Sequence, residues 1–208
     1  MKKVIIIHGY TSSPHRKKYQ IISEELDKLG VECSIPALPG GEHPHSKEWI
    51  ERIDKEVKNT TKPVVLVGHS LGTRAALLYL DKFESKVDAV ILISAFNNNF
   101  KENRNRRDGD YADFFDYGVN IDKVKKHAQT FIVAHSRDDD ALDYLQGVEL
   151  SKELGAKLIT YEHMGHFGGE ERAEENAEVF LNLIKSVLYD GFRCNLALSP
   201  PSTNVFIV

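Results

Sequence analysis

The fold of this chain is constrained most by a repeated alternation between short apolar runs and longer amphipathic stretches. The first run, 4–7, contains only Val and Ile, which is typical of a strand buried on both faces. Five more predicted strands lie at 31–35, 64–67, 87–94, 131–134 and 158–161. Strands that alternate with helices form βαβ units with right-handed crossovers. The alternation therefore predicts an α/β fold, a three-layer α/β/α sandwich around a mostly parallel sheet.

The amphipathic stretches between the strands predict the helices. The first helix is expected to begin in the Ser-Ser-Pro segment at 12–14, because Ser is favoured at the N-cap and Pro in the first turn. Gly30 is placed to end this helix. The other predicted helices lie at 46–59, 71–83, 121–127, 141–154 and 170–188.

Length and pattern together predict one α/β domain over 1–188. The whole chain has 208 residues, the size of a single globular domain. Residues 96–118 break the rhythm with Asn, Arg and Asp between aromatic residues, so we expect a small cap-like insertion there. Residues 189–208 contain a Ser-Pro-Pro-Ser motif and end in an apolar run. We expect this segment to be an appended or loosely packed tail.

The composition limits the classes of partner and the cell compartment that we expect for this protein. The formal net charge of −4 argues against nucleic acid as the main partner, because phosphate binding needs clustered Lys and Arg. No apolar run approaches the roughly 18 residues that a membrane span requires, and the opening run is too short for a signal peptide. Cys33 and Cys194 lie far apart, as in proteins of a reducing cytoplasm. We expect a cytoplasmic protein without a metal or cofactor, and no protein partner is indicated.

The strongest functional signal is the segment Gly-His-Ser-Leu-Gly at 68–72, which fits the G-x-S-x-G pattern. A predicted strand precedes it directly and a predicted helix follows, as in the nucleophile turn of α/β-hydrolases. Such a turn strains the backbone of the serine, and glycines two residues away on each side avoid steric clashes. The hydroxyl of Ser70 then projects above the sheet at the positive end of the helix. Ser70 is the predicted nucleophile.

A serine nucleophile needs a base and a carboxylate to orient it, in the chain order Ser, Asp or Glu, His. Two histidines, His163 and His166, follow the sixth predicted strand, where ligands bind in parallel sheets. His166 lies deeper in its loop and nearer the next helix, which favours it as the base. The spacing of the two would also suit a metal pair, but no third ligand lies nearby in the sequence, so zinc is not expected.

Three consecutive aspartates after the fifth predicted strand offer the orienting carboxylate. Only one of Asp138, Asp139 and Asp140 can contact the imidazole. We prefer Asp139, then Asp138, and Asp143 is a weaker outsider. The aspartates that do not contact the imidazole would cap the next helix or face solvent.

Two backbone N–H groups are expected to stabilise the oxyanion. One belongs to Leu71, the residue after the nucleophile, and the other to Tyr10, in the loop after the first strand. That loop begins with His8-Gly9, which also suits a tight turn between strand and helix.

These residues together resemble the small single-domain serine hydrolases of the YdeN-like and retinoblastoma-binding serine hydrolase family. The resemblance covers about residues 3–188. It rests on the segments His8-Gly9-Tyr10, 68–72, Ile93-Ser94-Ala95-Phe96, Ser136-Arg137-Asp138-Asp139 and Gly165-His166-Phe167. It implies a minimal α/β-hydrolase fold with a six-stranded sheet of order 2-1-3-4-5-6, with Asp139 as the acid and His166 as the base. Such proteins often carry Pro after the acid, whereas this chain has Asp140.

The resulting hypothesis is hydrolysis of a small carboxylic ester through an acyl-enzyme by Ser70, His166 and Asp139. Amide or thioester cleavage would use the same groups. The arginines at 104, 106 and 107 could bind an anion, although a solvated charged loop is the simpler interpretation. The alternative function is a protein-interaction module on a hydrolase scaffold, with weak or vestigial catalysis.

Overall fold

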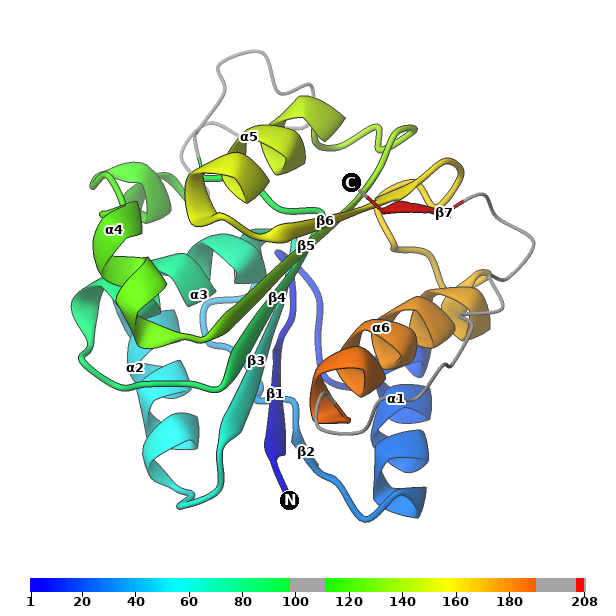
Figure 1. Cartoon of the computed structure of the whole chain (residues 1–208), viewed down its shortest axis with the longest axis horizontal. Coiled ribbons are helices and arrows are strands. Elements are labelled where there is room, and N and C mark those ends of the chain that lie inside the picture. Colours follow the sequence, from blue (N-terminus) through cyan, green and yellow to red (C-terminus); the bar gives the residue numbers. More distant parts are fainter. Residues whose placement is uncertain (98–110, 190–204, 208) are drawn as a thin grey trace.

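The structure is a computed structural model that describes residues 1–97, 111–189 and 205–207. Within these residues the centre is a seven-stranded sheet of order β2-β1-β3-β4-β5-β6-β7 (Figure 1). The strands are β1 (Lys3–Ile7), β2 (Glu32–Ser34), β3 (Val64–His69), β4 (Ala89–Ile93), β5 (Thr130–Ser136), β6 (Lys157–Tyr161) and β7 (Val205–Ile207). All neighbouring strands from β2 to β6 pair in parallel.

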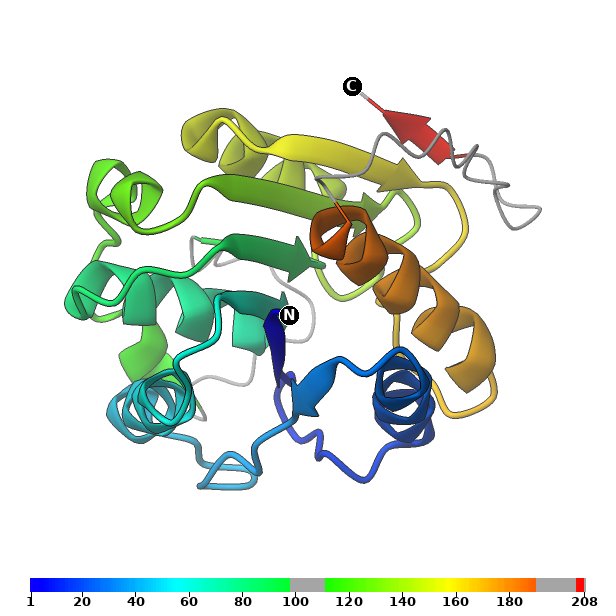
Figure 2. The ribbon, with the colours of Figure 1, turned by 60° about the horizontal axis from the view of Figure 1, so that its bottom comes forward.

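Helices cover both faces of the sheet and make it the middle of three layers. Helices α1 and α6 pack together on one face, and the other helices lie on the opposite face (Figures 1 and 2). The α-helices are α1 (Lys17–Lys28), α2 (Ser46–Lys58), α3 (Leu71–Lys82), α4 (Ile121–Val124), α5 (Tyr144–Leu154) and α6 (Ala173–Leu188). Short 3-10 helices cover Ala112–Phe115 and Lys125–His127.

The alternation of side chains along a strand explains why continuous apolar runs form this sheet. In β1, Val4 and Ile6 enter the core beneath α1 and α6, whereas Ile5 and Ile7 enter the core beneath α2 and α3. All four side chains are fully buried. A strand covered by helices on both faces needs apolar residues at every position, which is the pattern that the sequence shows.

The predicted order of the first six strands, 2-1-3-4-5-6, is confirmed. The structure adds a seventh strand that the sequence pattern did not predict, β7, which pairs antiparallel with β6. The described part of the C-terminal segment that pairs with β6 is three residues long and lies outside the predicted alternation of strands and helices. The limits of the predicted domain, 1–188, and of the tail, 189–208, stay predictions.

Three predicted helix starts are wrong. Helix α6 begins at Ala173 and not at 170, and the starts of α1 and α5 differ for local reasons. Helix α1 begins at Lys17 and not within 12–14, because that segment forms turns, with the N–H of Ser12 donating to the carbonyl of Gly9. Helix α5 begins at Tyr144 and not at 141, because the N–H groups there donate to a side chain at the site described below. The predicted end of α1 is confirmed, since Gly30 has φ +69°.

The predicted insertion at 96–118 is described only at its two ends, and the three arginines at 104, 106 and 107 lie outside the described residues, as does Cys194. In the described part, Phe114 is fully buried against Trp49, with ring centroids 5.2 Å apart. Buried Arg74 donates to the carbonyl oxygens of Phe114 and Tyr117. These contacts tie the end of the segment to α3.

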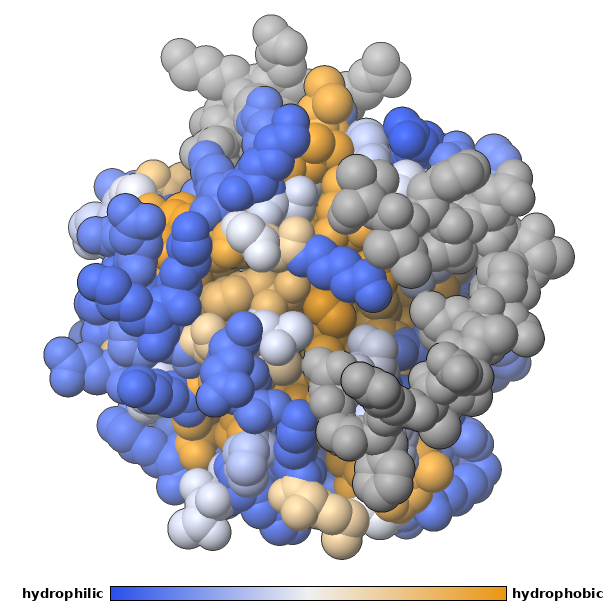
Figure 3. All heavy atoms as spheres, in the orientation of Figure 1, coloured by the Kyte–Doolittle hydropathy of each residue, from blue (hydrophilic) through white to orange (hydrophobic). Residues whose placement is uncertain are grey.

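Hydrophilic side chains dominate much of the surface on the face of Figure 1, and apolar atoms show between them toward the centre (Figure 3). Exposed apolar area of this kind is normal for a folded domain. Among the described residues, no helix has the length and apolar character needed to cross a membrane.

Candidate active site

Ser70 lies in the sharp turn from β3 into α3, with φ +54° and ψ −123°. A non-glycine residue in this region is strained, and such strain gathers at functional sites. The flanking glycines are required by close packing. A Cβ on Gly68 would lie 2.7 Å from the carbonyl oxygen of Gly72, and one on Gly72 would collide with the carbonyl of Ile7. The steric reason that the sequence offered for both glycines therefore applies.

The loop after β1 is pressed against this serine. A Cβ on Gly9 would lie 3.0 Å from the Cβ of Ser70 and 3.5 Å from its Oγ, so only a glycine fits here without movement. Tyr10, the next residue, lines the same pocket as Ser70. Leu71 occupies the first position of α3, where backbone N–H groups have no partner within the helix. Both predicted oxyanion donors therefore belong to segments next to Ser70.

A buried carboxylate meets an imidazole at the carboxyl ends of β5 and β6. The Nδ1 atom of His166 lies 3.0 Å from each carboxylate oxygen of Asp139. The Asp139 side chain is fully buried, and that of His166 is 25% exposed. Because a carboxylate only accepts, Nδ1 carries a proton, and in the neutral tautomer with this proton Nε2 presents a lone pair.

Asp139 accepts further hydrogen bonds that hold it in place. Ser94 Oγ donates at 2.7 Å, and the N–H groups of Ala141 and Leu142 donate at 3.0 Å each. His135 Nε2 lies 3.4 Å from the same carboxylate. Burial alone would raise the pKa of Asp139, but the hydrogen bonds from these side chains and from His166 outweigh burial and hold the pKa far below its usual range. The carboxylate is therefore charged at any physiological pH.

The other aspartates of the run have different contacts. Asp138 accepts from the hydroxyl of Ser136 at 2.6 Å and from the N–H of Gly165 at 2.8 Å. The Ser136 hydroxyl in turn accepts from the N–H of Met164. Asp138 thus ties the β5 end to the loop that carries the imidazole. Asp140 is exposed, and Asp143 caps α5 by accepting from the N–H of Leu145.

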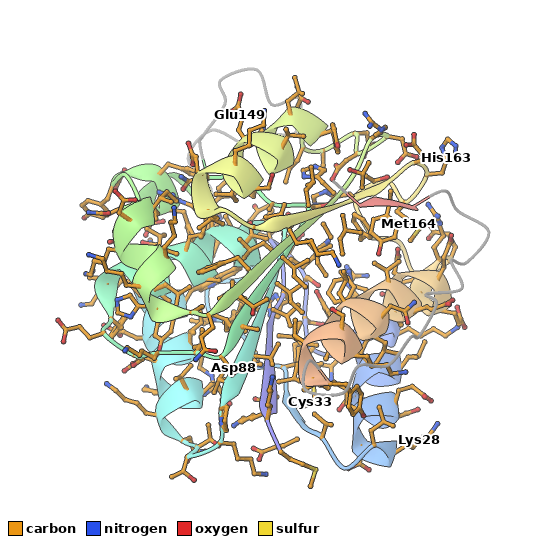
Figure 4. All side chains as sticks on the ribbon, viewed as in Figure 1. Lys28, Cys33, Asp88, Glu149, His163 and Met164 are labelled. Carbon is orange, nitrogen blue, oxygen red and sulfur yellow. The ribbon has the colours of Figure 1, made fainter. Side chains whose placement is uncertain are left out.

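His163, the alternative base, lies away from the carboxylate–imidazole pair. It sits beyond β6 at the edge of the molecule and points outward (Figure 4). Its side chain is 80% exposed, and its nearest carboxylate partner, that of Asp138, is 4.0 Å away. Within the described part of the chain, no group of three or more His, Cys, Asp or Glu side chains could hold a metal ion.

His69, between Gly68 and the nucleophile, has a role that the sequence did not indicate. Its Nε2 lies 2.8 Å from the carbonyl oxygen of His166, and the two rings are 5.3 Å apart. Burial holds the pKa of His69 well below its usual range, so the ring is neutral. Since a carbonyl only accepts, Nε2 donates, and the serine turn is thereby joined to the imidazole loop.

A pocket of about 360 Å³ opens over these groups, and Ser70 and His166 both line it. The structure has no hydrogen bond between the Ser70 hydroxyl and the imidazole, although the Nε2 lone pair of His166 is the group left to accept one. In hydrolases such bonds often tighten only when substrate is bound. The other lining residues are Gly9, Tyr10, Thr11, Ser12, Arg16, Lys18, His69, Gly168, Gly169 and Glu170.

The strained serine at a strand–helix turn and the parallel sheet that carries it define the α/β-hydrolase class of fold. A family model for serine hydrolases matches residues 4–183, and the chain belongs to that family. It is 27% identical over 172 residues to YdeN of Bacillus subtilis (strain 168), a match that covers 82% of this chain and 88% of YdeN. The resemblance to YdeN-like serine hydrolases is confirmed.

Solved structures show the same fold. The crystal structure of B. subtilis YdeN matches with a TM-score of 0.77 and 22% identity, and covers 90% of this chain and 99% of YdeN. Est1E from Butyrivibrio proteoclasticus has a TM-score of 0.68 and 19% identity, with 90% and 88% covered. A carboxylesterase structure from Nitrososphaera gargenis has a TM-score of 0.70 and 14% identity, with 91% and 92% covered.

Proposed function

We propose that the protein hydrolyses small carboxylic esters through an acyl-enzyme on Ser70, with His166 as the base and Asp139 as the acid that orients it. The observation that carries the proposal is the pair formed by buried Asp139 and His166, whose imidazole lines the pocket that also contains strained Ser70. Membership of the serine hydrolase family supports it.

In the first half of the reaction, the Ser70 hydroxyl attacks the ester carbonyl while Nε2 of His166 takes its proton. The negative charge that forms on the carbonyl oxygen is stabilised by the N–H groups of Tyr10 and Leu71. Nε2 then returns the proton to the departing alkoxide, and the alcohol leaves. Asp139 keeps the imidazole in the required tautomer and stabilises its cation.

In the second half, a water molecule replaces the alcohol. His166 takes a proton from this water, whose oxygen attacks the acyl-enzyme carbonyl. The bond to Ser70 breaks, the hydroxyl regains its proton and the carboxylic acid is released. Thioesters and amides would pass through the same steps. The ester is favoured because a structurally similar protein is a carboxylesterase, and it is favoured over the amide because an alkoxide is a better leaving group than an amide anion.

A fluorophosphonate probe tests the proposal directly. We expect one probe per wild-type molecule, attached to Ser70, and turnover of p-nitrophenyl acetate. Ser70→Ala should abolish both. Ser186→Ala, which removes an exposed hydroxyl on α6, is the matched control and should label like the wild type. Folded wild-type protein that neither labels nor turns over the ester would refute the proposal and favour the interaction-module alternative.

A further inference from the structure

A lysine that the mechanism does not use lines the pocket. Lys18, in the first turn of α1, is only 6% exposed, yet it borders the cavity that contains Ser70 and His166. Its ammonium donates to the carbonyl oxygen of Phe167 at 2.7 Å and lies 5.0 Å from the ring centroids of Tyr19 and Phe180. Among the described residues, no carboxylate lies within 4.0 Å of this ammonium.

This environment does not compensate a buried charge. An ammonium has three donor protons, and the structure gives Lys18 one hydrogen-bond acceptor. Buried lysines are almost always paired, because removing the charge from water is costly. Burial, with a smaller contribution from Arg16, lowers the pKa of Lys18 to about 7, while Glu170 opposes the decrease. An anion placed beside the ammonium would restore its charged form.

The other charged groups around the pocket leave this charge uncompensated. Arg16 and Glu170 form an ion pair at 3.2 Å, and both side chains are about half exposed. Their charges offset each other at the rim. Asp139 is fully buried and already paired with His166, and His69 is neutral. In its protonated form, Lys18 therefore gives a positive charge to the pocket that Ser70 also lines.

A purely structural role explains only part of this arrangement. Lys18 donates a hydrogen bond to the carbonyl of Phe167, the residue after His166. This bond helps to hold the backbone of Phe167, which has a φ of +52°. A neutral amide or hydroxyl could donate the same hydrogen bond without burying a charge. The ammonium supplies what a neutral donor cannot, an attraction for an anion that enters the pocket.

We propose that this pocket selects substrates that carry a carboxylate, and that Lys18 binds this carboxylate while Ser70 attacks the ester. The proposal rests on the proposed ester hydrolysis and deepens it. The expected substrates are esters of dicarboxylic acids or of hydroxy acids that keep one free carboxylate. Because Lys18 contacts the loop of His166, the bound anion would lie on the imidazole side of the serine.

Two matched ester pairs test the proposal on both sides of the scissile bond. On the acyl side, p-nitrophenyl hydrogen adipate is compared with p-nitrophenyl hexanoate, which has a methyl group in place of the carboxylate. On the alcohol side, 4-carboxyphenyl acetate is compared with phenyl acetate. The readout is the ratio of kcat/KM for the anionic ester to that for the neutral ester, after subtraction of the Ser70→Ala rate.

In Lys18→Gln, we expect this ratio to fall about tenfold or more for at least one pair, while Lys18→Arg keeps most of it. Loss of the Phe167 contact would slow both members of a pair alike and leave the ratio constant. Lys17→Gln is the matched control, since it removes a neighbouring lysine that is half exposed and pairs with Glu174. It should change neither ratio by more than about twofold.

Equal ratios in the wild type and Lys18→Gln, for both pairs, would overturn the inference and leave the hydrolase proposal standing. Folded wild type that neither labels with fluorophosphonate nor turns over p-nitrophenyl acetate would instead refute the hydrolase, and this inference with it. If Lys18→Gln does not fold, the pH dependence of the kcat/KM ratio in the wild type tests the inference instead. This ratio should fall as the pH rises through about 7, where Lys18 loses its proton, and a constant ratio from about pH 6 to about pH 9 would overturn the inference.

Discussion

Asp139 and Lys18 are both buried, both contact the loop that carries His166, and differ in how completely their charges are compensated. Asp139 receives hydrogen bonds from two backbone N–H groups and from the side chains of Ser94 and His166. Lys18 has one carbonyl oxygen and two aromatic rings. The protein fully compensates the charge of Asp139, which suits a residue that holds another side chain in place. The charge of Lys18 is only partly compensated, which suits a residue that binds an anionic ligand.

The largest loss of kcat is expected when the nucleophile Ser70 or the base His166, which Asp139 holds in place, is replaced. Ser70→Ala and His166→Ala should each lower kcat for p-nitrophenyl acetate by about 10⁴-fold or more, because each removes a group that the same step requires. Fluorophosphonate labelling gives a second readout. If His166→Ala kept near wild-type turnover, His166 would not be the base, and Asp139 would have no imidazole to orient for catalysis.

Variants of the two neighbouring aspartates distinguish two roles. Asp139 orients the imidazole of His166, whereas Asp138 holds the loop that carries it. Asp139→Asn should lower kcat by about 10²–10⁴-fold, since the amide no longer selects the required tautomer. Asp138→Asn should lower it by no more than about tenfold, because that side chain ties the backbone of Gly165 and does not contact the imidazole. The reverse ranking would transfer the role of acid to Asp138.

The compensation of Asp139 also predicts how stability depends on pH. Its pKa in the folded protein lies below the unfolded value of about 3.9. The carboxylate therefore contributes stability above about pH 4, and this contribution is lost as the pH falls through the folded pKa. Between about pH 6 and about pH 3, the wild type should lose about 1 kcal/mol more than Asp139→Asn. Chemical denaturation at each pH measures the difference, and parallel curves would contradict the account.

Ser94→Ala should have the smallest effect of the series. It removes one donor from a carboxylate that keeps its other partners, so kcat should fall about threefold and the free energy of unfolding by about 1 kcal/mol. Ser94 has φ +48°, which alanine tolerates no better, so the variant changes the hydroxyl and not the backbone strain. An unchanged kcat would show that Asp139 is held without this hydroxyl.

Most of the fold could be predicted because it depends on periodicity along the chain. Runs such as Val4 to Ile7 require cover on both faces, and their alternation with amphipathic helices leaves few topologies. The exact strand order came from the family resemblance. The turn at Ser70 was also predictable, because its steric demand for Gly68 and Gly72 is local. The edge strand β7 was not predictable, because a short apolar run outside the alternation does not indicate which strand it will pair with, and β6 offers the free edge.

The sequence by itself determined that a serine, an aspartate and a histidine would gather at the carboxyl ends of the parallel strands. It favoured Asp139 over Asp138 with support from the family resemblance, since neighbours in one loop share the same local chemistry. Only the tertiary structure decided which carboxylate faces the imidazole, and only it brought His69, Ser94 and Lys18 to the site. The physical reason is that a hydrogen bond or a buried charge depends on the direction of a side chain after distant segments have packed, and no spacing along the chain encodes that direction.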